Sequence, residues 1–217
     1  MKIRFQEFSP RKFSFHQDPV LVVEDFWTAD ERAFFREAMN RSKWTALSEM
    51  AEVSAAFSNS GNWLKAEIGQ AEAQAFLNKL SLSCVAEYIE SFPNVKARHL
   101  SFNYYSYGAG DCLPTHDDTD EAYARDRQSY HALRRIACAT YFHDEWQPDW
   151  GGELIIYDAR QRKGERVLDV KHCISPQPGC LTLFTVPRFH RVCRVDTLAG
   201  PHKRLSIAGW FMTEHDT

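Results

Sequence analysis

The sequence predicts a mainly β protein of the α+β class, in which two N-terminal helices pack on a double-layered β sandwich or barrel. Two stretches before residue 97 carry apolar side chains at helical spacing. From Arg98 onward, short apolar or alternating runs are separated by clusters of glycine, proline, aspartate and asparagine, which is typical of antiparallel strands and their turns. Helices followed by strands favour a layered fold around one core.

The N-terminal half supplies a first strand and both helices. The apolar, β-branched run over residues 19–23 is suited to a strand. Thr28 and Glu31 form the capping-box signature of a helix that continues to about residue 40. A second helix is predicted over residues 70–92, where a proline then stops it. Between residues 42 and 61 the pattern is too weak to assign an element.

Seven or eight strands are predicted in the second half of the chain. They cover residues 98–107, 113–116, 134–142, 152–157, 166–171, 180–185, 190–195 and 204–212. The length of 217 residues predicts a single domain over 1–217. Within it, we expect residues 1–97 to form the helical support and the strands that lead into the core, and residues 98–213 to form the β core.

Composition and charge argue against several classes of function. The net charge of −3 gives no chain-wide attraction to nucleic acid or to an anionic membrane surface. The N-terminus lacks the apolar stretch of a secretory signal, no run is long enough to span a bilayer, and the six cysteines include no Cys-x-x-Cys pair. We therefore expect a cytoplasmic protein with no nucleic-acid or membrane partner. The basic run over 160–166 is interpreted as a solvated turn or a substrate-facing loop.

One histidine–carboxylate pair has the residue types of a metal site. His116 and Asp118 are two residues apart, and on an extended segment such residues project to the same face. Imidazole and carboxylate together suit a divalent metal such as Fe(II), and a distant histidine would complete a facial triad of two histidines and one carboxylate. His190, which follows a predicted strand and turn, is the candidate. The competing interpretations are a loop histidine beside aspartates, a core histidine at position 190, and Asp117 as the ligand.

The last predicted strand carries a candidate anion-binding arginine. Alternation places Arg204, Ser206 and Trp210 on one face of this strand. Burying an arginine is costly unless an anion meets it, and the guanidinium fork can bind a carboxylate through two hydrogen bonds. The alternatives are an arginine at the rim paired with a surface carboxylate, and a shifted register that uses Lys203.

Short stretches in a fixed order carry a family resemblance. They are Tyr107-Gly-Ala-Gly110, His116-x-Asp118, Ala139-Thr-Tyr141, Gly151-Gly-Glu-Leu154, Pro178-Gly-Cys-Leu-Thr-Leu-Phe184, His190-Arg-Val192, and Arg204-Leu-Ser206 ahead of Trp210-Phe211. With them, the segment from Leu100 to Thr213 resembles the 2-oxoglutarate/Fe(II) dioxygenase superfamily, in particular its prolyl-4-hydroxylase-like branch. The resemblance implies a double-stranded β-helix, the jelly-roll or cupin-like core, with N-terminal supporting helices.

The resemblance also implies roles for the matching residues. His116, Asp118 and His190 would bind Fe(II), and Arg204 would bind the distal carboxylate of 2-oxoglutarate. The residues expected to support or line that pocket are Tyr107, Tyr141, Ser206, Val192 and Trp210. The alternative for the tyrosines is packing with a satisfied hydroxyl. Two residues on the face of Tyr107 are candidates for the substrate side, namely Asn103 and Tyr105.

The implied activity is that of an Fe(II)/2-oxoglutarate-dependent dioxygenase. Such an enzyme uses O2, with ascorbate as an accessory reductant, to hydroxylate an unactivated C–H bond, and it releases succinate and CO2. A carboxylate at Asp118 argues against the related halogenases, which leave that ligand position to a halide. The expected substrate is a prolyl residue of a protein or peptide, or free proline, and a small-molecule or natural-product hydroxylase is the alternative.

Two alternatives come from other classes of function, a cupin-type barrel that binds metal or ligand without turnover, and a zinc-dependent hydrolase with the same ligands. The residues that choose the substrate are expected in the N-terminal half and in loops. The polar segment over 117–134, with 119–133 at its centre, is interpreted as a loop over the active-site mouth or as a merely solvated loop. We expect a monomer or a simple homodimer.

Overall fold

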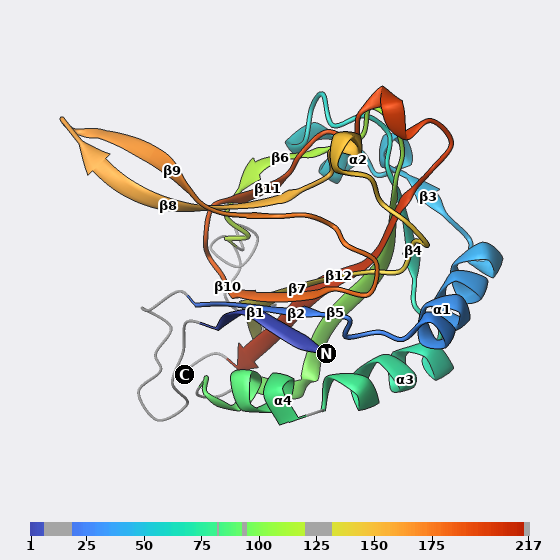
Figure 1. The fold of residues 1–217 in the computed structure, drawn as a ribbon. Helices are drawn as coiled ribbons and strands as arrows, with labels where there is room; N and C mark the ends of the chain where they lie inside the picture. The colour runs from blue at the N-terminus through green and yellow to red at the C-terminus, as the bar shows by residue number, and fades with distance from the viewer. Residues whose placement is uncertain (7–18, 82, 93–94, 120–131, 215–217) are drawn as a thin grey trace.

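Two antiparallel β-sheets face each other in the computed structural model of the protein, which describes residues 1–6, 19–81, 83–92, 95–119 and 132–214 (Figure 1). The larger sheet has the spatial order β1 (Lys2–Gln6), β2 (Val20–Glu24), β10 (Leu181–Thr185), β7 (Ala132–Tyr141), β12 (Arg204–Glu214), β5 (Val95–Tyr107), β4 (Leu64–Glu67) and β3 (Thr45–Ala46). The smaller sheet has the order β6 (Leu113–His116), β11 (His190–Val192), β8 (Leu154–Arg162) and β9 (Glu165–Ile174). This mainly β (α+β) arrangement confirms the predicted jelly-roll, the double-stranded β-helix.

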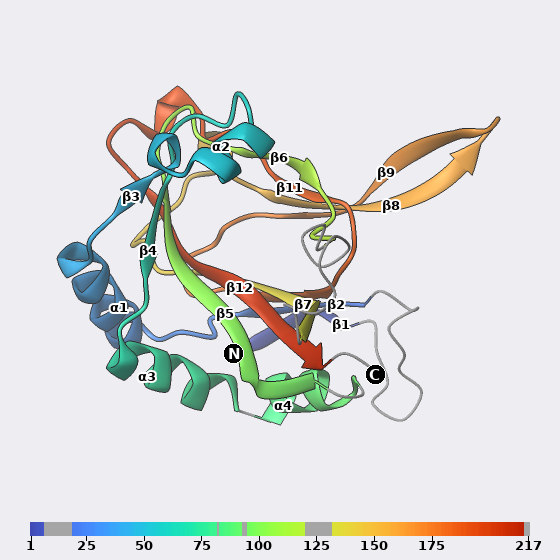
Figure 2. The same ribbon diagram turned by 180° about the vertical axis from the view of Figure 1, so that it is seen from behind.

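Three helices cover the outer face of the larger sheet, namely α1 (Ala29–Arg41), α3 (Gln70–Leu80) and α4 (Ser83–Glu90) (Figures 1 and 2). The Thr28 side chain accepts from the backbone N–H of Glu31, and the Glu31 carboxylate accepts from that of Thr28, so the predicted capping box is confirmed. Trp27 stacks on Phe76 of α3 and donates its indole N–H to the Thr140 hydroxyl of β7, which ties this helix to the sheet. Of the helices in the described ranges, none combines the length and apolarity that a bilayer-spanning segment needs.

The alternating side chains of β12 face two regions, the core beneath the helices and the space between the two sheets. Ile207 and Phe211 point outward into the core beneath the helices, together with Phe35, Phe76 and other apolar side chains. The opposite face of the strand, which includes Arg204, looks into the space between the two sheets. The predicted alternation of this strand is therefore confirmed, and its inner face is available for a site.

The predicted helix over 70–92 is wrong as a single element, because α3 ends at Leu80 and α4 begins at Ser83. Ser81 ends α3. Its backbone N–H donates to the carbonyl of Leu77 and its hydroxyl donates to the carbonyl of Asn78, so that both satisfy carbonyls of the last turn.

Several short elements in the N-terminal half were not predicted. They are β1, β3, β4, the 3-10 helix η2 (Leu47–Glu49) and the helix α2 (Ala51–Ala56). They are two to six residues long and have no periodic apolar pattern to reveal them. Two further 3-10 helices lie in loops, namely η3 (Pro148–Trp150) between β7 and β8 and η4 (Thr197–Ala199) between β11 and β12.

A long hairpin made of β8 and β9 projects beyond the rest of the molecule (Figures 1 and 2). Its end carries the basic run over 160–166, and every residue of that run is exposed. This exposure agrees with a solvated turn, and the substrate-facing interpretation stays a prediction.

His143 is a histidine built into the core as a neutral group. It is 4% exposed, lies against Trp146, and has its Nε2 at 2.7 Å from the carbonyl of Pro176. Burial lowers the pKa of His143 to about 4.

Two neighbouring phenylalanines of α1 provide a matched test of the packing. Phe35→Ala removes a side chain that is 1% exposed and is expected to lower the free energy of unfolding by about 3–5 kcal/mol. Phe34→Ala, at a position 43% exposed, is expected to change it by less than about 1 kcal/mol. Urea unfolding measures both, and similar losses in the two variants would contradict this packing.

His143 also predicts a pH dependence of stability. An unfolded histidine binds protons below about pH 6.5, whereas folded His143 stays neutral down to about pH 4. The unfolded state therefore gains protons first, and stability falls as the pH drops from about 6.5 towards 4, by about 3 kcal/mol for this group. Unfolding of metal-free protein across this range should show a shallower slope for His143→Gln than for the wild type. Equal slopes for the two proteins would refute the assignment.

Candidate active site

A cavity of about 330 Å³ lies between the two sheets and brings together most of the predicted site residues. It is walled by inward side chains of β5 and β12 on the larger sheet and of β6 and β11 on the smaller one. The predicted residues that line it are Asn103, Tyr105, Tyr107, His116, Asp118, His190, Val192, Arg204, Ser206 and Trp210.

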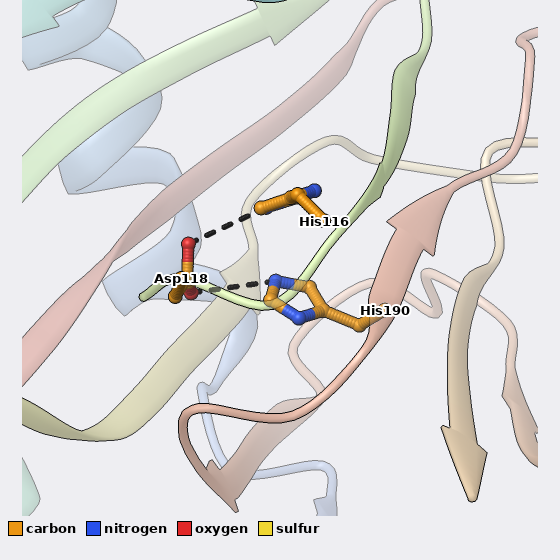
Figure 3. A group of neighbouring side chains, drawn as sticks. All are labelled: His116, Asp118 and His190. Atoms are coloured by element: carbon orange, nitrogen blue, oxygen red, sulfur yellow. Dashed lines mark ion pairs between the residues drawn. The ribbon is translucent and has the colours of Figure 1, made fainter. Parts of the chain in front are cut away.

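The His116, Asp118 and His190 side chains converge in this cavity (Figure 3). His116 ends β6 and His190 begins β11, and the pairing of these strands makes the two histidines direct neighbours. The Nε2 atom of each imidazole lies 3.4 Å from a carboxylate oxygen of Asp118. The three potential ligand atoms lie within 4.8 Å of one another, and no second cluster of this kind occurs among the described residues. Two imidazoles and one carboxylate suit Fe(II).

The prediction that strand alternation brings Asp118 to the side of His116 is wrong, although the two side chains do meet. Strand alternation would need an extended segment through Asp118, but β6 ends at His116 and Asp118 has a φ of 62°. Aspartate tolerates this left-handed conformation better than most residues do. The local turn therefore directs Asp118 towards the histidines, while the side chain of Asp117 accepts from the backbone N–H of Thr119.

Backbone carbonyls fix the orientation of both imidazoles. The Nδ1 atom of His116 lies 2.7 Å from the carbonyl of Pro114, and that of His190 lies 2.7 Å from the carbonyl of Arg188. Because a carbonyl can only accept, Nδ1 is the protonated nitrogen of the neutral ring and Nε2 keeps its lone pair. Both lone pairs are thus presented where a metal would need them.

The charge of Asp118 is held in place by its neighbours. Burial alone would raise its pKa, but the two histidines and the indole N–H of Trp210, which donates to Asp118 at 2.7 Å, hold the pKa well below its usual range. Burial lowers the pKa of His190 to about 4. For His116, burial is outweighed by the hydrogen bond and charge of Asp118, which raise the pKa. At neutral pH the site offers one carboxylate and at least one neutral imidazole.

Arg204 is a buried cation without a carboxylate partner among the described residues. Its side chain is 3% exposed, Nε donates to the carbonyl of Gly152 at 2.9 Å, and one terminal nitrogen donates to the hydroxyl of Tyr141 at 3.2 Å. These neutral acceptors orient the guanidinium but leave its charge uncompensated, which is costly in a buried site. An anionic ligand in the cavity would supply the missing charge. Lys203, the alternative considered for this role, is exposed.

The supporting residues surround Arg204 and the metal-site candidates. Tyr107 and Tyr141 face the guanidinium, with ring centroids 5.5 and 4.7 Å from its carbon, and burial raises the pKa of both hydroxyls. Ser206 is paired across the sheet with Tyr141 and Tyr105. Trp210 contacts Asp118 directly, a contact that the sequence did not reveal.

Sequence reasoning missed one wall of the cavity. Side chains in and around α2 and β4 complete it, namely Met50, Val53, Phe57, Trp63 and Lys65. Phe57 contacts the ring of His116 edge-on, with centroids 5.4 Å apart. Arg134 was also missed. The predicted loop over 117–134 falls mostly on residues 120–131, which lie outside the described part of the chain.

Comparison with known proteins gives the family of this chain. The family model described as the 2OG-Fe(II) oxygenase superfamily matches residues 101–212, which is more than half of the sequence. A search of curated proteins finds no match.

Solved structures share the fold at low sequence identity. A prolyl-4-hydroxylase from Pseudomonas putida has a TM-score of 0.55 and 20% identity, with 90% of this chain and 93% of that chain covered. The viral collagen prolyl hydroxylase of Paramecium Bursaria Chlorella virus-1, in its 2OG complex, has a TM-score of 0.57 and 15% identity over 89% and 96% of the two chains. HygX from Streptomyces hygroscopicus, with nickel, 2-oxoglutarate and hygromycin B bound, has a TM-score of 0.54 and 14% identity over 90% and 83%. The chain belongs to the 2OG-Fe(II) oxygenase superfamily, and it is a 2-oxoglutarate-dependent dioxygenase that uses Fe(II), 2-oxoglutarate and O2.

Proposed function

We propose that this dioxygenase hydroxylates an unactivated C–H bond of a prolyl residue or of free proline. His116, Asp118 and His190 bind the iron, and Arg204 binds the distal carboxylate of 2-oxoglutarate. The observation that carries the assignment of residues is the buried, uncompensated guanidinium of Arg204 in the same cavity as the only histidine–carboxylate cluster of the described residues. Membership of the superfamily argues against the two alternative functions, a cupin-type barrel without turnover and a zinc-dependent hydrolase.

The residues around the site have separate tasks in this proposal. When bound, iron and 2-oxoglutarate would supply the oxidising chemistry, in which O2 converts 2-oxoglutarate to succinate and CO2, with one oxygen atom entering succinate and the other entering the substrate as its new hydroxyl. Tyr141 and the Gly152 carbonyl orient Arg204, and Trp210 fixes the carboxylate of Asp118. The apolar wall beside His116, which includes Phe57, excludes water from the reacting centre.

Two kinds of substrate are supported by similarity of fold. The prolyl hydroxylases that share the fold support a prolyl substrate, because they match over about nine-tenths of this chain. HygX, whose structure holds hygromycin B, supports the alternative of a small-molecule or natural-product hydroxylase. Succinate release in the presence of proline, prolyl peptides and natural-product panels, with and without ascorbate, distinguishes the two.

Neighbouring aspartates allow a matched test of the metal site. Asp118→Ala should weaken anaerobic Mn(II) binding by at least about 10- to 100-fold, because even changes behind the ligands have effects of that size. Asp117→Ala should bind as tightly as the wild type, since its carboxylate makes a turn with Thr119. Titration followed by electron paramagnetic resonance measures both, and a reversed order would make Asp117 the ligand.

The adjacent cations Arg204 and Lys203 test the cosubstrate site in the same way. Arg204→Ala should raise the dissociation constant of 2-oxoglutarate at least about 30-fold, which corresponds to about 2 kcal/mol for truncating one partner of a buried charge pair. Lys203→Ala should leave it within about twofold, because that side chain is exposed. Calorimetry with Mn(II)-loaded protein and succinate formation with Fe(II) give the two readouts. Unchanged binding in Arg204→Ala would refute the assignment.

A further inference from the structure

We propose that the substrate carries an oxyanion group, a carboxylate or a phosphate, which is bound by Arg134 with support from Lys65. The inference rests on the proposed function, since it concerns the part of the same cavity left for the substrate. That part is lined by five polar side chains, which we call the substrate-side cluster: Lys65, Ser101, Asn103, Tyr105 and Arg134.

Strand register explains how these side chains reach one face. Lys65 of β4 lies opposite Tyr105 of β5, and the next inward positions of β5 are Asn103 and Ser101. Arg134 reaches the same face from β7 because the pairing of β7 with β12 shifts by one residue between Phe211 and Met212. Such bulges redirect side chains beside active sites.

Arg134 is held by its flat face, which leaves its donors free. Its guanidinium carbon lies 3.9 Å from the centre of the Trp210 ring, and the same indole donates to Asp118. Stacking of this kind uses the face of the guanidinium, while the N–H groups around its edge point outward in a fork suited to an oxyanion. None of those N–H groups has a hydrogen-bond or ion-pair partner in the described part of the chain.

The other members of the cluster are equally available. Within the described ranges, neither the ammonium of Lys65, the hydroxyls of Ser101 and Tyr105, nor the amide of Asn103 makes a hydrogen bond or an ion pair. Glu67 lies opposite Asn103 but is exposed, and it makes no ion pair with Lys65. Five polar groups around one part of a cavity without mutual pairing indicate a polar ligand.

The balance of charge decides the sign of that ligand. The charges of Fe(II) and Arg204 are positive (+2 and +1), and those of Asp118 and 2-oxoglutarate are negative (−1 and −2). Together these four groups therefore have a net charge of zero. Asp118 is the one acidic residue among the described residues that line the cavity, so nothing there offsets Lys65 and Arg134. The substrate side therefore stays cationic when the metal and the cosubstrate are bound, which favours an anionic substrate.

The shape of the cavity limits the rest of the substrate. Its volume of about 330 Å³ is at the lower end for small-molecule sites, and it must also hold the cosubstrate. The opposing wall, formed by Met50, Val53, Phe57 and Trp63, is apolar. Lys65 and Arg134 belong to strands three spacings apart, roughly 14 Å, so Arg134 binds the oxyanion and Lys65 supports it by its positive charge from another part of the cavity. A compact apolar body with an oxyanion at its end fits these limits.

Matched acids and amides test the proposal. The probes are N-acetylproline with its amide, 3-phenylpropionate with its amide, and phenyl phosphate. Each is titrated anaerobically into protein loaded with Mn(II) and saturating 2-oxoglutarate, and binding is read by calorimetry. We expect each acid to bind at least about tenfold more tightly than its amide, which is the effect of a hydrogen bond to a charged group. Whichever of 3-phenylpropionate and phenyl phosphate binds more tightly identifies the oxyanion.

Variants locate the preference on the two cations. In the double variant Lys65→Gln, Arg134→Gln the ratio of amide to acid dissociation constants should fall below about twofold, while Arg134→Lys should keep part of it. Arg162→Gln, which removes one charge from the exposed end of the hairpin, should leave the ratio unchanged. The bound fraction of 2-oxoglutarate is followed in every sample, because it shows that the site is intact and reveals an acid that merely displaces the cosubstrate.

The outcomes separate the two proposals. If the wild type does not bind 2-oxoglutarate, the proposed function fails. Other results overturn only the present inference, provided that the wild type binds 2-oxoglutarate. These results are acids that bind no better than their amides, acids that do not bind at millimolar concentration, and acids that displace 2-oxoglutarate. A preference for acids that persists in the double variant also overturns it.

Discussion

The interior of this protein depends on one buried charge, the guanidinium of Arg204. Its strand, β12, lies between β7 and β5, and it cannot move outward without breaking its pairing with both. The protein supplies only neutral acceptors, a backbone carbonyl and a tyrosine hydroxyl, so the site is electrically incomplete by itself. In the proposed function the dianionic cosubstrate supplies the missing charge, so its binding contributes to the stability of the fold as well as to the chemistry.

Asp118, in the turn after β6, differs from Arg204, because neighbouring side chains already stabilise its charge. Asp118 accepts from Trp210 and lies beside both imidazoles, and backbone carbonyls hold Nδ1 of each ring. Few atoms need to move when a metal binds, since the lone pairs already face one point. The same Trp210 ring supports Arg134 on its face, so the proposed metal ligand Asp118 and the proposed substrate side share one rigid indole.

The sequence predicted the features that depend on period and spacing, and missed those that depend on distant contacts. Alternation along β12 correctly placed Arg204 and Trp210 inward, and apolar runs located most of the strands. Asp118 was chosen for a strand geometry that does not exist, because the left-handed turn after His116 has no reliable sequence signature. Phe57 and Lys65 lie in short elements whose position is set only by packing against the sheet, and Arg134 reaches the cavity only through a bulge.

The projecting hairpin has an outer strand edge, and charged side chains along that edge oppose its pairing with other chains. β9 ends the spatial order of the smaller sheet, so its outer edge has no strand partner among the described residues. An edge of that length invites pairing with another chain and aggregation. Glu165, Arg166, Asp169 and Lys171 place charges of both signs along it, and Asp169 forms an ion pair with Arg160 of β8. A second edge would have to match that pattern of charges before it could pair, so the ribbon can extend into solvent and the protein can remain dispersed.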